Sequence, residues 1–209
     1  MSETLSDKAY NIIKEKLIYA EKGSYLSIRE YADKLEMSYT PVREAFLRLH
    51  KEGLLELVPK VGFFTTRMDL NEILQIFQVR ECVEIFVFKK VFNMITDEHI
   101  KMLEKCVEEQ RHGLKTNNIR EYIDADEKFH GVFIDIYNNQ YLTKLYKNIR
   151  EQYLICSNKI AESHSEVAIE EHMQIIQHIK CKDLEKAVST LNSHIENAWH
   201  RMKDGYIRV

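Results

Sequence analysis

Ser38-Tyr-Thr-Pro-Val-Arg-Glu-Ala-Phe-Leu-Arg-Leu-His-Lys-Glu-Gly53 is the stretch that decides how the N-terminal part of this chain folds. It predicts one helix, with a start signal at its N-terminal end and a stop signal at its C-terminal end. Thr40 is the expected N-cap, and Pro41 suits the first helical position, where its missing N–H costs nothing. Gly53 supplies a left-handed stop at the other end.

The same helix has an apolar face and a polar one. Its apolar side chains recur at helical spacing and can therefore face a core: Val42, Phe46, Leu49 and the following Leu54. The side chains left pointing outward near its ends and flank are Tyr39, Thr40, Arg43 and Lys51. A helix of this kind is built to touch something outside its own fold.

Short elements on both sides of this helix complete a known layout. Ser27-Ile-Arg-Glu30 is a capping box that predicts a helix through about Leu35, followed by a tight turn. Two apolar runs, residues 54–58 and 63–66, flank Pro59-Lys-Val-Gly62 and predict a hairpin. Together these elements predict a winged helix-turn-helix domain, whose second helix enters the DNA major groove. The alternative is a small helical subdomain in which Arg43 is merely solvated.

The strings Ser38-Tyr-Thr-Pro-Val-Arg-Glu-Ala-Phe46 and Lys51-Glu-Gly-Leu54, with Gly62 in the hairpin, resemble the DNA-binding domain of the GntR family of bacterial transcription regulators over roughly residues 4–67. The resemblance implies DNA contacts from an Arg before the turn, from the start of the recognition helix and from the wing tip. The residues at these positions are Arg29, Ser38, Tyr39, Thr40, Arg43, Lys60 and Gly62. Two positions depart from the family: Tyr39 replaces a usual Arg, and Gly23-Ser24-Tyr25 replaces the usual Pro-Gly.

Length and composition are those of a globular two-domain protein. The 209 residues are 44% hydrophobic and 30% charged. The N-terminus lacks a basic patch followed by an apolar run, and charges interrupt the longest apolar stretches, so neither a signal peptide nor a membrane span is expected. The cysteines show no Cys-x-x-Cys spacing, which indicates reduced thiols and a cytoplasmic location. They are Cys82, Cys106, Cys156 and Cys181.

Charge differs modestly between the two parts of the chain. Residues 1–67 hold 11 Lys and Arg against 10 Asp and Glu, whereas residues 68–209 hold 19 against 23, which gives the total of −3. An acidic total argues against nonspecific coating of nucleic acid. It leaves room for a locally basic recognition face on the N-terminal part.

Residues 68–209 are predicted to be helical almost throughout. Asp69-Leu-Asn-Glu72 opens a helix, and breaks are expected near residues 93–96, 113–118, 138–139, 163–165 and 180–183. The expected fold is therefore mainly α. It consists of a winged helix-turn-helix domain with three helices and a two-stranded wing over residues 1–67, a linker near residues 65–69, and a bundle of six helices over residues 68–209.

Polar residues lie on the apolar faces of three of these helices. Asp126 and His130 are one turn apart on one such face, and His172 and His194 occupy similar faces of two other helices. Unpaired polar groups are costly to bury, and these four side chains could form a site for a first-row metal. The alternative is that Asp126 and His130 hydrogen-bond each other while the other two are satisfied in the core.

The runs Asp126-Glu-Lys-Phe-His130, Glu171-His-Met-Gln-Ile-Ile176 and Asp183-Leu-Glu-Lys-Ala187, with His194, resemble the FCD ligand-binding domain of FadR-type GntR regulators. The resemblance implies that a divalent transition metal (zinc, nickel, iron or manganese) is bound by Asp126, His130, His172 and His194. It also implies that a small carboxylate effector can add to that metal. Arg80, on an apolar stripe, is a further candidate for the effector anion, although an ion pair with Glu84 is the favoured alternative.

The leading hypothesis is a homodimeric transcription factor of the FadR/FCD type that binds a pseudo-palindromic operator in double-stranded DNA. Dimerisation is expected because one recognition helix reads only a few base pairs. The competing hypothesis is a metal-dependent hydrolase with an accessory nucleic-acid-binding domain, because three His and one Asp could activate water. The sequence shows no nucleophile elbow and no Gly-rich phosphate loop, and a hydrolase leaves the winged domain unexplained.

Overall fold

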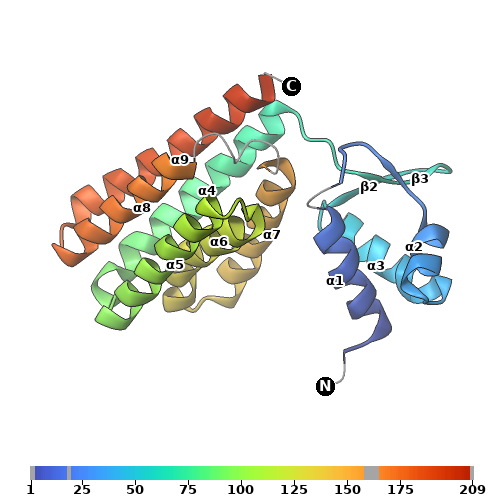
Figure 1. Ribbon diagram of the computed structural model, residues 1–209, viewed down its shortest axis with the longest axis horizontal. Coiled ribbons are helices and arrows are strands. Elements are labelled where there is room, and N and C mark those ends of the chain that lie inside the picture. The colour runs from blue at the N-terminus through green and yellow to red at the C-terminus, as the bar shows by residue number, and fades with distance from the viewer. Residues whose placement is uncertain (1–2, 18–19, 158–164, 208–209) are drawn as a thin grey trace. The chain divides into compact units, whose positions relative to one another are not determined.

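A computed structural model describes residues 3–17, 20–157 and 165–207 of the chain. The chain divides into two compact units, one built mainly from Met1–Asp69 and the other beginning at Leu70. The first unit combines helices with a small sheet, and the described residues of the second form helices and their connections (Figure 1).

The first unit has the winged helix-turn-helix layout that the sequence predicts. Its elements are α1 (Leu5–Leu17), β1 (Tyr25–Leu26), α2 (Ile28–Leu35), α3 (Tyr39–Lys51), β2 (Leu55–Val58) and β3 (Gly62–Thr65). The core forms around Phe46, which is fully buried and meets the rings of Tyr31 and Phe63 edge-on. The rest of the predicted apolar face is buried with it: Val42, Leu49 and Leu54.

The turns on either side of α3 follow the sequence signals. Ser27 caps α2 by accepting a hydrogen bond from the backbone N–H of Glu30, and Glu36 ends that helix with a left-handed backbone (φ 53°). Gly53 follows α3 with φ 77°, a conformation that favours glycine because it has no Cβ. The left-handed Glu36 thus leaves only a short turn between α2 and α3.

Thr40 is not the N-cap of the recognition helix, contrary to the prediction. Helix α3 begins at Tyr39, so Ser38, with an extended backbone (ψ 160°), takes the N-cap position and Pro41 becomes the third helical residue. Both registers suit proline, because none of the N–H groups of a first turn has a partner within its helix. Proline therefore marks the first turn of a helix but not its first residue.

Strands β2 and β3 form the predicted wing, with Val58 opposite Gly62. The prediction of two strands was incomplete, because β1 adds a third strand along β3 in the order β1-β3-β2. The pairing continues past β1, where Gly23 N–H donates to Thr65 O and Thr65 N–H donates to Ser24 O, each at 3.0 Å. A two-residue strand shows too little alternation to be recognised in a sequence.

The second unit contains, within its described residues, the six helices that the sequence predicts. They are α4 (Leu70–Val91), α5 (Asp97–Lys115), α6 (Ile119–Tyr137), α7 (Gln140–Ser157), α8 (Ser165–Lys180) and α9 (Leu184–Ile207), with the short helix η1 (Phe92–Met94) after α4. Helix α5 packs against α6 and α8, and α9 packs against α4 and α8 (Figure 1). The predicted break at residues 163–165 falls mostly outside the described residues.

Polar residues at the helix boundaries set where these helices begin and end. Thr96 caps α5 by accepting from the backbone N–H of His99, and Asn118 caps α6 in the same way through Glu121. Asn138 then ends α6 with a left-handed backbone (φ 52°). These caps explain why the breaks could be located from the sequence.

Two negative expectations concern membranes and disulfides. Within the described residues, none of the helices combines the length and the apolar character that crossing a membrane requires. The described cysteine side chains, Cys82, Cys106 and Cys181, are free thiols. The side chain of Cys156 lies outside the described part of the chain.

Two glycines in neighbouring helices should respond oppositely to alanine. At Gly131 in α6 no atom other than those of its chain neighbours and its own helix backbone lies within 4 Å of the place where a Cβ would stand, whereas at Gly113 in α5 that place is 2.7 Å from the backbone N of Tyr122. Gly131→Ala should raise the free energy of unfolding by about 0.5–1 kcal/mol, because alanine loses less backbone entropy in a helix. Gly113→Ala should lower it by about 1–3 kcal/mol, because two helix backbones must separate. Urea unfolding measures both, and an equal loss in the two variants would contradict this explanation.

Candidate nucleic-acid interface and candidate metal centre

One depression on the first unit collects most of the residues that the sequence marks for DNA contact. It has a volume of about 600 Å³ and is lined from α2, α3 and the wing. Five of the seven predicted residues line it: Arg29, Tyr39, Arg43, Lys60 and Gly62. The other two, Ser38 and Thr40, lie exposed at the start of α3. The fold therefore gathers residues from three separate elements on one surface.

The start of α3 can offer hydrogen-bond donors to a phosphate. The Ser38 side chain makes no capping bond, and the N–H groups of a first helical turn lack partners within the helix. The helix dipole adds positive potential at the same end. Arg43 places a full charge one turn into the helix on an exposed side chain. Such an end can hold the DNA backbone while Arg43 reaches a base edge.

Tyr25 shapes the wing and was not identified from the sequence as a functional residue. Its ring packs edge-on against Phe64, with 5.5 Å between ring centroids. A Cβ at Gly62 would stand 2.7 Å from the Tyr25 ring, and Gly62 has φ 141°. The packing of the wing therefore requires glycine at position 62. Tyr25 also lines the depression, and it is 56% exposed.

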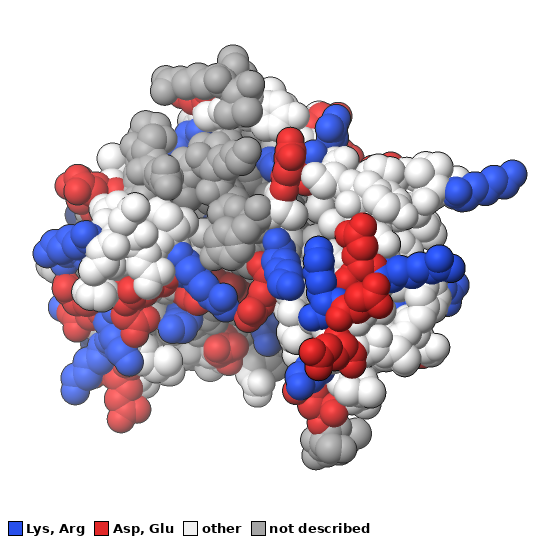
Figure 2. Space-filling model, turned by 45° about the vertical axis from the view of Figure 1, so that its right-hand side comes forward, with Lys and Arg blue, Asp and Glu red and all other residues white. Residues whose placement is uncertain are grey.

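Surface charge is mixed on the face shown in Figure 2. Lys and Arg side chains lie among Asp and Glu side chains there, without a large area of one sign. Nonspecific attraction to the DNA backbone is therefore expected to be weak from this face.

His130, His172 and His194 meet in the interior of the second unit. They come from α6, α8 and α9, and each is at most 3% exposed. The Nε2 atom of His130 lies 3.3 Å from Nε2 of His172 and 3.3 Å from Nε2 of His194. Two nitrogen ligands of one tetrahedral metal, each about 2.0–2.1 Å from it, are roughly 3.3 Å apart. Two of the three Nε2–Nε2 distances thus match metal-binding spacing, and the ligand atoms of all three rings lie within 4.8 Å of one another.

In two of the imidazoles the other ring nitrogen, Nδ1, lies at hydrogen-bond distance from a side-chain oxygen of a different helix. His172 Nδ1 lies 2.9 Å from Oε1 of Gln110 on α5. His194 Nδ1 lies 2.7 Å from Oε2 of Glu171 on α8. An oxygen acceptor holds the proton on Nδ1 and leaves the Nε2 lone pair directed inward. This is the tautomer that binds a metal through Nε2.

The third imidazole, His130, faces a buried ion pair on α4. Arg80 Nε donates to Glu84 Oε1 at 2.8 Å, and Glu84 Oε2 lies 2.8 Å from His130 Nδ1, at ion-pair distance but not aligned as a hydrogen bond. Of the two roles considered for Arg80, the structure shows the pairing with Glu84. Burial alone raises the pKa of Glu84, but the charge of Arg80 and the contact with His130 together outweigh burial and hold that pKa below its usual range.

Asp126 lies beside the three histidines and also engages a buried arginine. Its Oδ1 is 3.9 Å from His130 Nε2 and 3.8 Å from His172 Nε2. Its Oδ2 accepts a hydrogen bond from Arg150 on α7, whose side chain is completely buried. Burial raises the pKa of Asp126, yet Arg150 and the imidazoles lower it more, so the carboxylate stays ionised. All four predicted ligands are therefore neighbours, with Asp126 slightly farther from the Nε2 atoms than these are from one another.

The residues that orient this cluster were not found from the sequence. Gln110 and His172 are 62 positions apart, and no local motif connects them. Arg150 did leave a signal, because it interrupts an apolar face one turn from Tyr146 and one turn from Leu154, both of which are buried. A charged residue on an apolar face needs a buried partner of opposite charge, but the sequence alone does not identify that partner.

Comparisons with known proteins agree with this two-part architecture. Residues 5–65 match the bacterial regulatory proteins of the gntR family, and residues 75–197 match the FCD domain. The chain belongs to the GntR family of transcriptional regulators with an FCD domain. This assignment agrees with the two resemblances found in the sequence.

Relatives of this GntR-family regulator cover nearly its whole length. The gluconate operon transcriptional repressor of Bacillus subtilis (strain 168) is 25% identical over 191 residues, which cover 88% of this chain and 78% of the relative. The HTH-type transcriptional repressor RspR of Escherichia coli (strain K12) is 21% identical over 202 residues, which cover 93% and 87%. The solved structure of E. coli McbR/YncC shares the fold with a TM-score of 0.85 at 20% identity, covering 99% of this chain and all of that one. The two curated relatives are named as repressors, so the hydrolase hypothesis gains no support from them.

The stability of the metal-free protein should fall as the pH drops below about 6.5. Burial lowers the pKa of His172 and of His194 below the ordinary value of 6.5, and at His194 it outweighs the Glu171 hydrogen bond. The unfolded chain then binds protons that the folded chain does not, so each group should lower the free energy of unfolding by up to about 1.4 kcal/mol per pH unit below that value.

A matched pair of variants tests the origin of this slope. His172→Asn should reduce the change in the free energy of unfolding with pH. His200→Asn, which alters an exposed histidine, should leave this pH dependence unchanged. Urea unfolding at several pH values between about 5 and 7.5 measures the slope, a range above that in which the carboxylates titrate. The same pH dependence in all three proteins would show that His172 does not contribute to it.

Proposed function

We propose that this chain is a homodimeric, sequence-specific DNA-binding repressor whose operator affinity is controlled by a small carboxylate bound at a divalent metal. Residues 1–67 act as the DNA-binding domain, and residues 68–209 act as the effector-binding and dimerisation domain. As a regulator of chromosomal DNA, the protein works in the cytoplasm.

The DNA-binding role rests on the depression beside α3. Its residues supply the three kinds of contact that duplex recognition needs: basic side chains for phosphates, a helix N-terminus, and Arg43 for a base edge. Arg29, Ser38, Thr40, Lys60 and Gly62 are assigned to positioning contacts. Tyr39, which replaces a usual Arg, is assigned to the choice of operator. Two such surfaces related by a two-fold axis would read a pseudo-palindrome.

The metal role rests on the donor set of the second unit. Asp126, His130, His172 and His194 offer one carboxylate and three imidazoles, a set that suits zinc, nickel, iron or manganese. When bound, the metal supplies open coordination positions for a carboxylate ligand. The surrounding residues hold the imidazoles in one tautomer and exclude bulk water from the centre. Arg80 is assigned to holding Glu84 beside His130.

Control of DNA binding requires that the effector bind two states of the dimer differently. A ligand with equal affinity for both states shifts nothing, whatever its strength. A coupling of about 1–3 kcal/mol is typical of regulators of this kind and would change operator affinity roughly 5- to 150-fold. The buried centre joins several helices, so a ligand there can bias how they pack.

Arg43→Ala should lower affinity for the cognate operator by about 1–3 kcal/mol, with a smaller loss on a random duplex, because a bidentate contact to a base is lost. Arg48→Ala is the matched control on the same helix, since Arg48 pairs with Asp7 and Glu52. Fluorescence anisotropy with both duplexes measures the effect. A uniform loss on both duplexes would make Arg43 a phosphate contact, and no loss on either would remove α3 as the recognition helix.

The purified protein should contain about one transition-metal ion per subunit, and removing the ion should lower its thermal stability. His172→Ala should reduce metal content while the first unit stays folded, whereas His200→Ala should retain the metal. Elemental analysis and thermal unfolding with and without chelator measure both effects. Full metal content in His172→Ala would show that the metal is bound elsewhere.

A further inference from the structure

Helix α7 carries buried hydrogen-bond donors that the described chain does not satisfy. Arg150 is 0% exposed and Tyr146 is 3% exposed. Arg150 uses Nη2 for Asp126, but its Nε and Nη1 have no hydrogen-bond partner, and neither has the Tyr146 hydroxyl. The two residues are one turn apart, so their donors lie on the same side of the helix. An anion that accepted hydrogen bonds from both side chains would remove the cost of leaving them unpaired.

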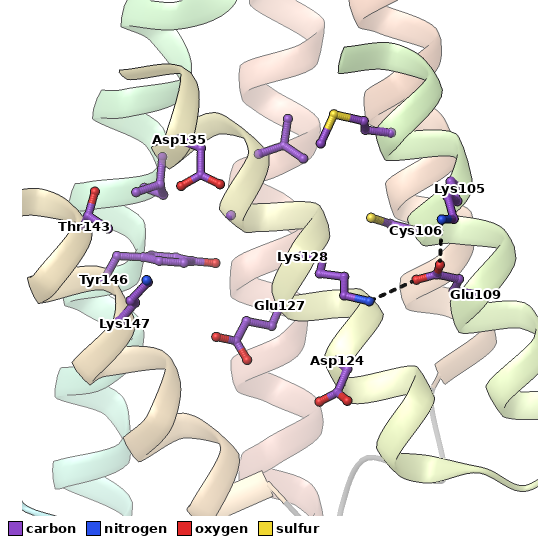
Figure 3. Close-up of a pocket in the computed structure, with 14 residues that line it drawn as sticks. Lys105, Cys106, Glu109, Asp124, Glu127, Lys128, Asp135, Thr143, Tyr146 and Lys147 are labelled. Atoms are coloured by element: carbon purple, nitrogen blue, oxygen red, sulfur yellow. Dashed lines mark hydrogen bonds and ion pairs between the residues drawn. The ribbon is translucent and has the colours of Figure 1, made fainter. Parts of the chain in front are cut away.

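A cleft leads from the surface to Tyr146. It has a volume of about 650 Å³ and is lined from α5, α6 and α7. Figure 3 shows the Tyr146 side chain extending from α7 into this cleft toward α6. The charged groups that act on the Tyr146 hydroxyl include Arg150, Glu84 and Asp126, which surround the histidine cluster. Tyr146 therefore stands between the cleft and the polar interior.

The buried and partly buried charges around the three histidines balance one another without a metal. They form three ion pairs: Arg80 with Glu84, Arg150 with Asp126, and Arg201 with Glu171. A divalent metal would add two positive charges to this interior, where uncompensated charge is expensive. A dianion restores neutrality, whereas a monocarboxylate leaves one charge in excess.

The contacts of Asp126 indicate the distance between two places that can bind an anion, the Arg150 guanidinium and the three-histidine centre. One carboxylate group reaches Arg150 through Oδ2, and its Oδ1 lies 3.9 Å and 3.8 Å from the Nε2 atoms of His130 and His172. The guanidinium and the histidine centre are thus separated by little more than one carboxylate and its contacts. A short-chain diacid can span that separation with one carboxylate at each point.

We propose that the effector is a short-chain dicarboxylate, with one carboxylate at the three-histidine centre and the other accepting hydrogen bonds from the Tyr146 hydroxyl and from one unused Arg150 donor, Nε or Nη1. This inference rests on the proposed function, because the first carboxylate needs the metal. Arg150 and Tyr146 make the site selective for diacids over monoacids, because they bind the second carboxylate. The cleft beside Tyr146 is the route by which the acid enters.

Calorimetric titration of the metal-loaded, full-length protein with succinate, glutarate and butyrate tests the inference. Butyrate has the chain length of succinate but only one carboxylate. At least one diacid should bind about tenfold or more tightly than butyrate, because hydrogen bonds to a charged group are the strong ones. Tyr146→Phe and Arg150→Lys should each weaken that diacid roughly tenfold, with butyrate affinity changed by less than about twofold.

The variants carry their own controls. Lys keeps a cation opposite Asp126 but loses the planar fork of donors, and Phe removes only the hydroxyl of Tyr146. Tyr141→Phe, at a 74% exposed position on the same helix, should bind every acid as the wild type does. Metal content and the unfolding temperature are measured for each protein. If Arg150→Lys loses the metal, Tyr146→Phe decides the outcome, since it alters no charged group.

Two results would overturn this inference alone: butyrate binding as tightly as the better diacid, or Tyr146→Phe binding the diacids with wild-type affinity. The second result would show that ordered water satisfies these donors. If butyrate nevertheless changes operator affinity, the proposed function stands without the diacid site. If neither diacids nor butyrate bind to the metal-loaded protein or change its operator affinity, both this inference and the proposed effector control fail.

Discussion

Placing polar groups inside an apolar helical bundle is the constraint on which the second unit depends. Three imidazoles, Gln110 and two arginine–carboxylate pairs lie where water cannot solvate them freely. Each therefore needs a partner, and in most cases that partner comes from another helix. Glu84 links α4 to α6, Gln110 links α5 to α8, and Arg150 links α7 to α6. This network fixes how the helices are rotated, and so it directs the Nε2 atoms toward one point.

The first unit meets the opposite requirement, because its functional groups must stay exposed. The core around Phe46 buries one face of α3 completely, which holds the helix while Arg43 and the helix N-terminus remain at the surface. Tyr25 supports the wing beside them through its contact with Phe64. Because apolar packing carries the stability, the exposed residues are free to be chosen for DNA contact.

The helices were predictable from local chemistry, and the two errors had different origins, one local and one non-local. Capping residues such as Ser27 and Asn118 fix boundaries through bonds only a few residues long, so the sequence reveals them. The start of α3 was misplaced by two positions, because proline fits any position of a first turn. Strand β1 was missed because it exists only through its pairing with β3, a contact between residues distant in sequence.

Helical periodicity determined which faces are buried, and by itself it placed Asp126, His130, His172 and His194 on inward faces. The sequence thus determined the two-part fold, its recognition helix and a set of candidate metal ligands. Only the tertiary structure decided that the Nε2 atoms converge, that Arg80 pairs with Glu84, and that Arg150 keeps two donors unused. The physical reason is that periodicity fixes a direction from one helix axis, whereas distances between side chains depend on how separate helices pack together.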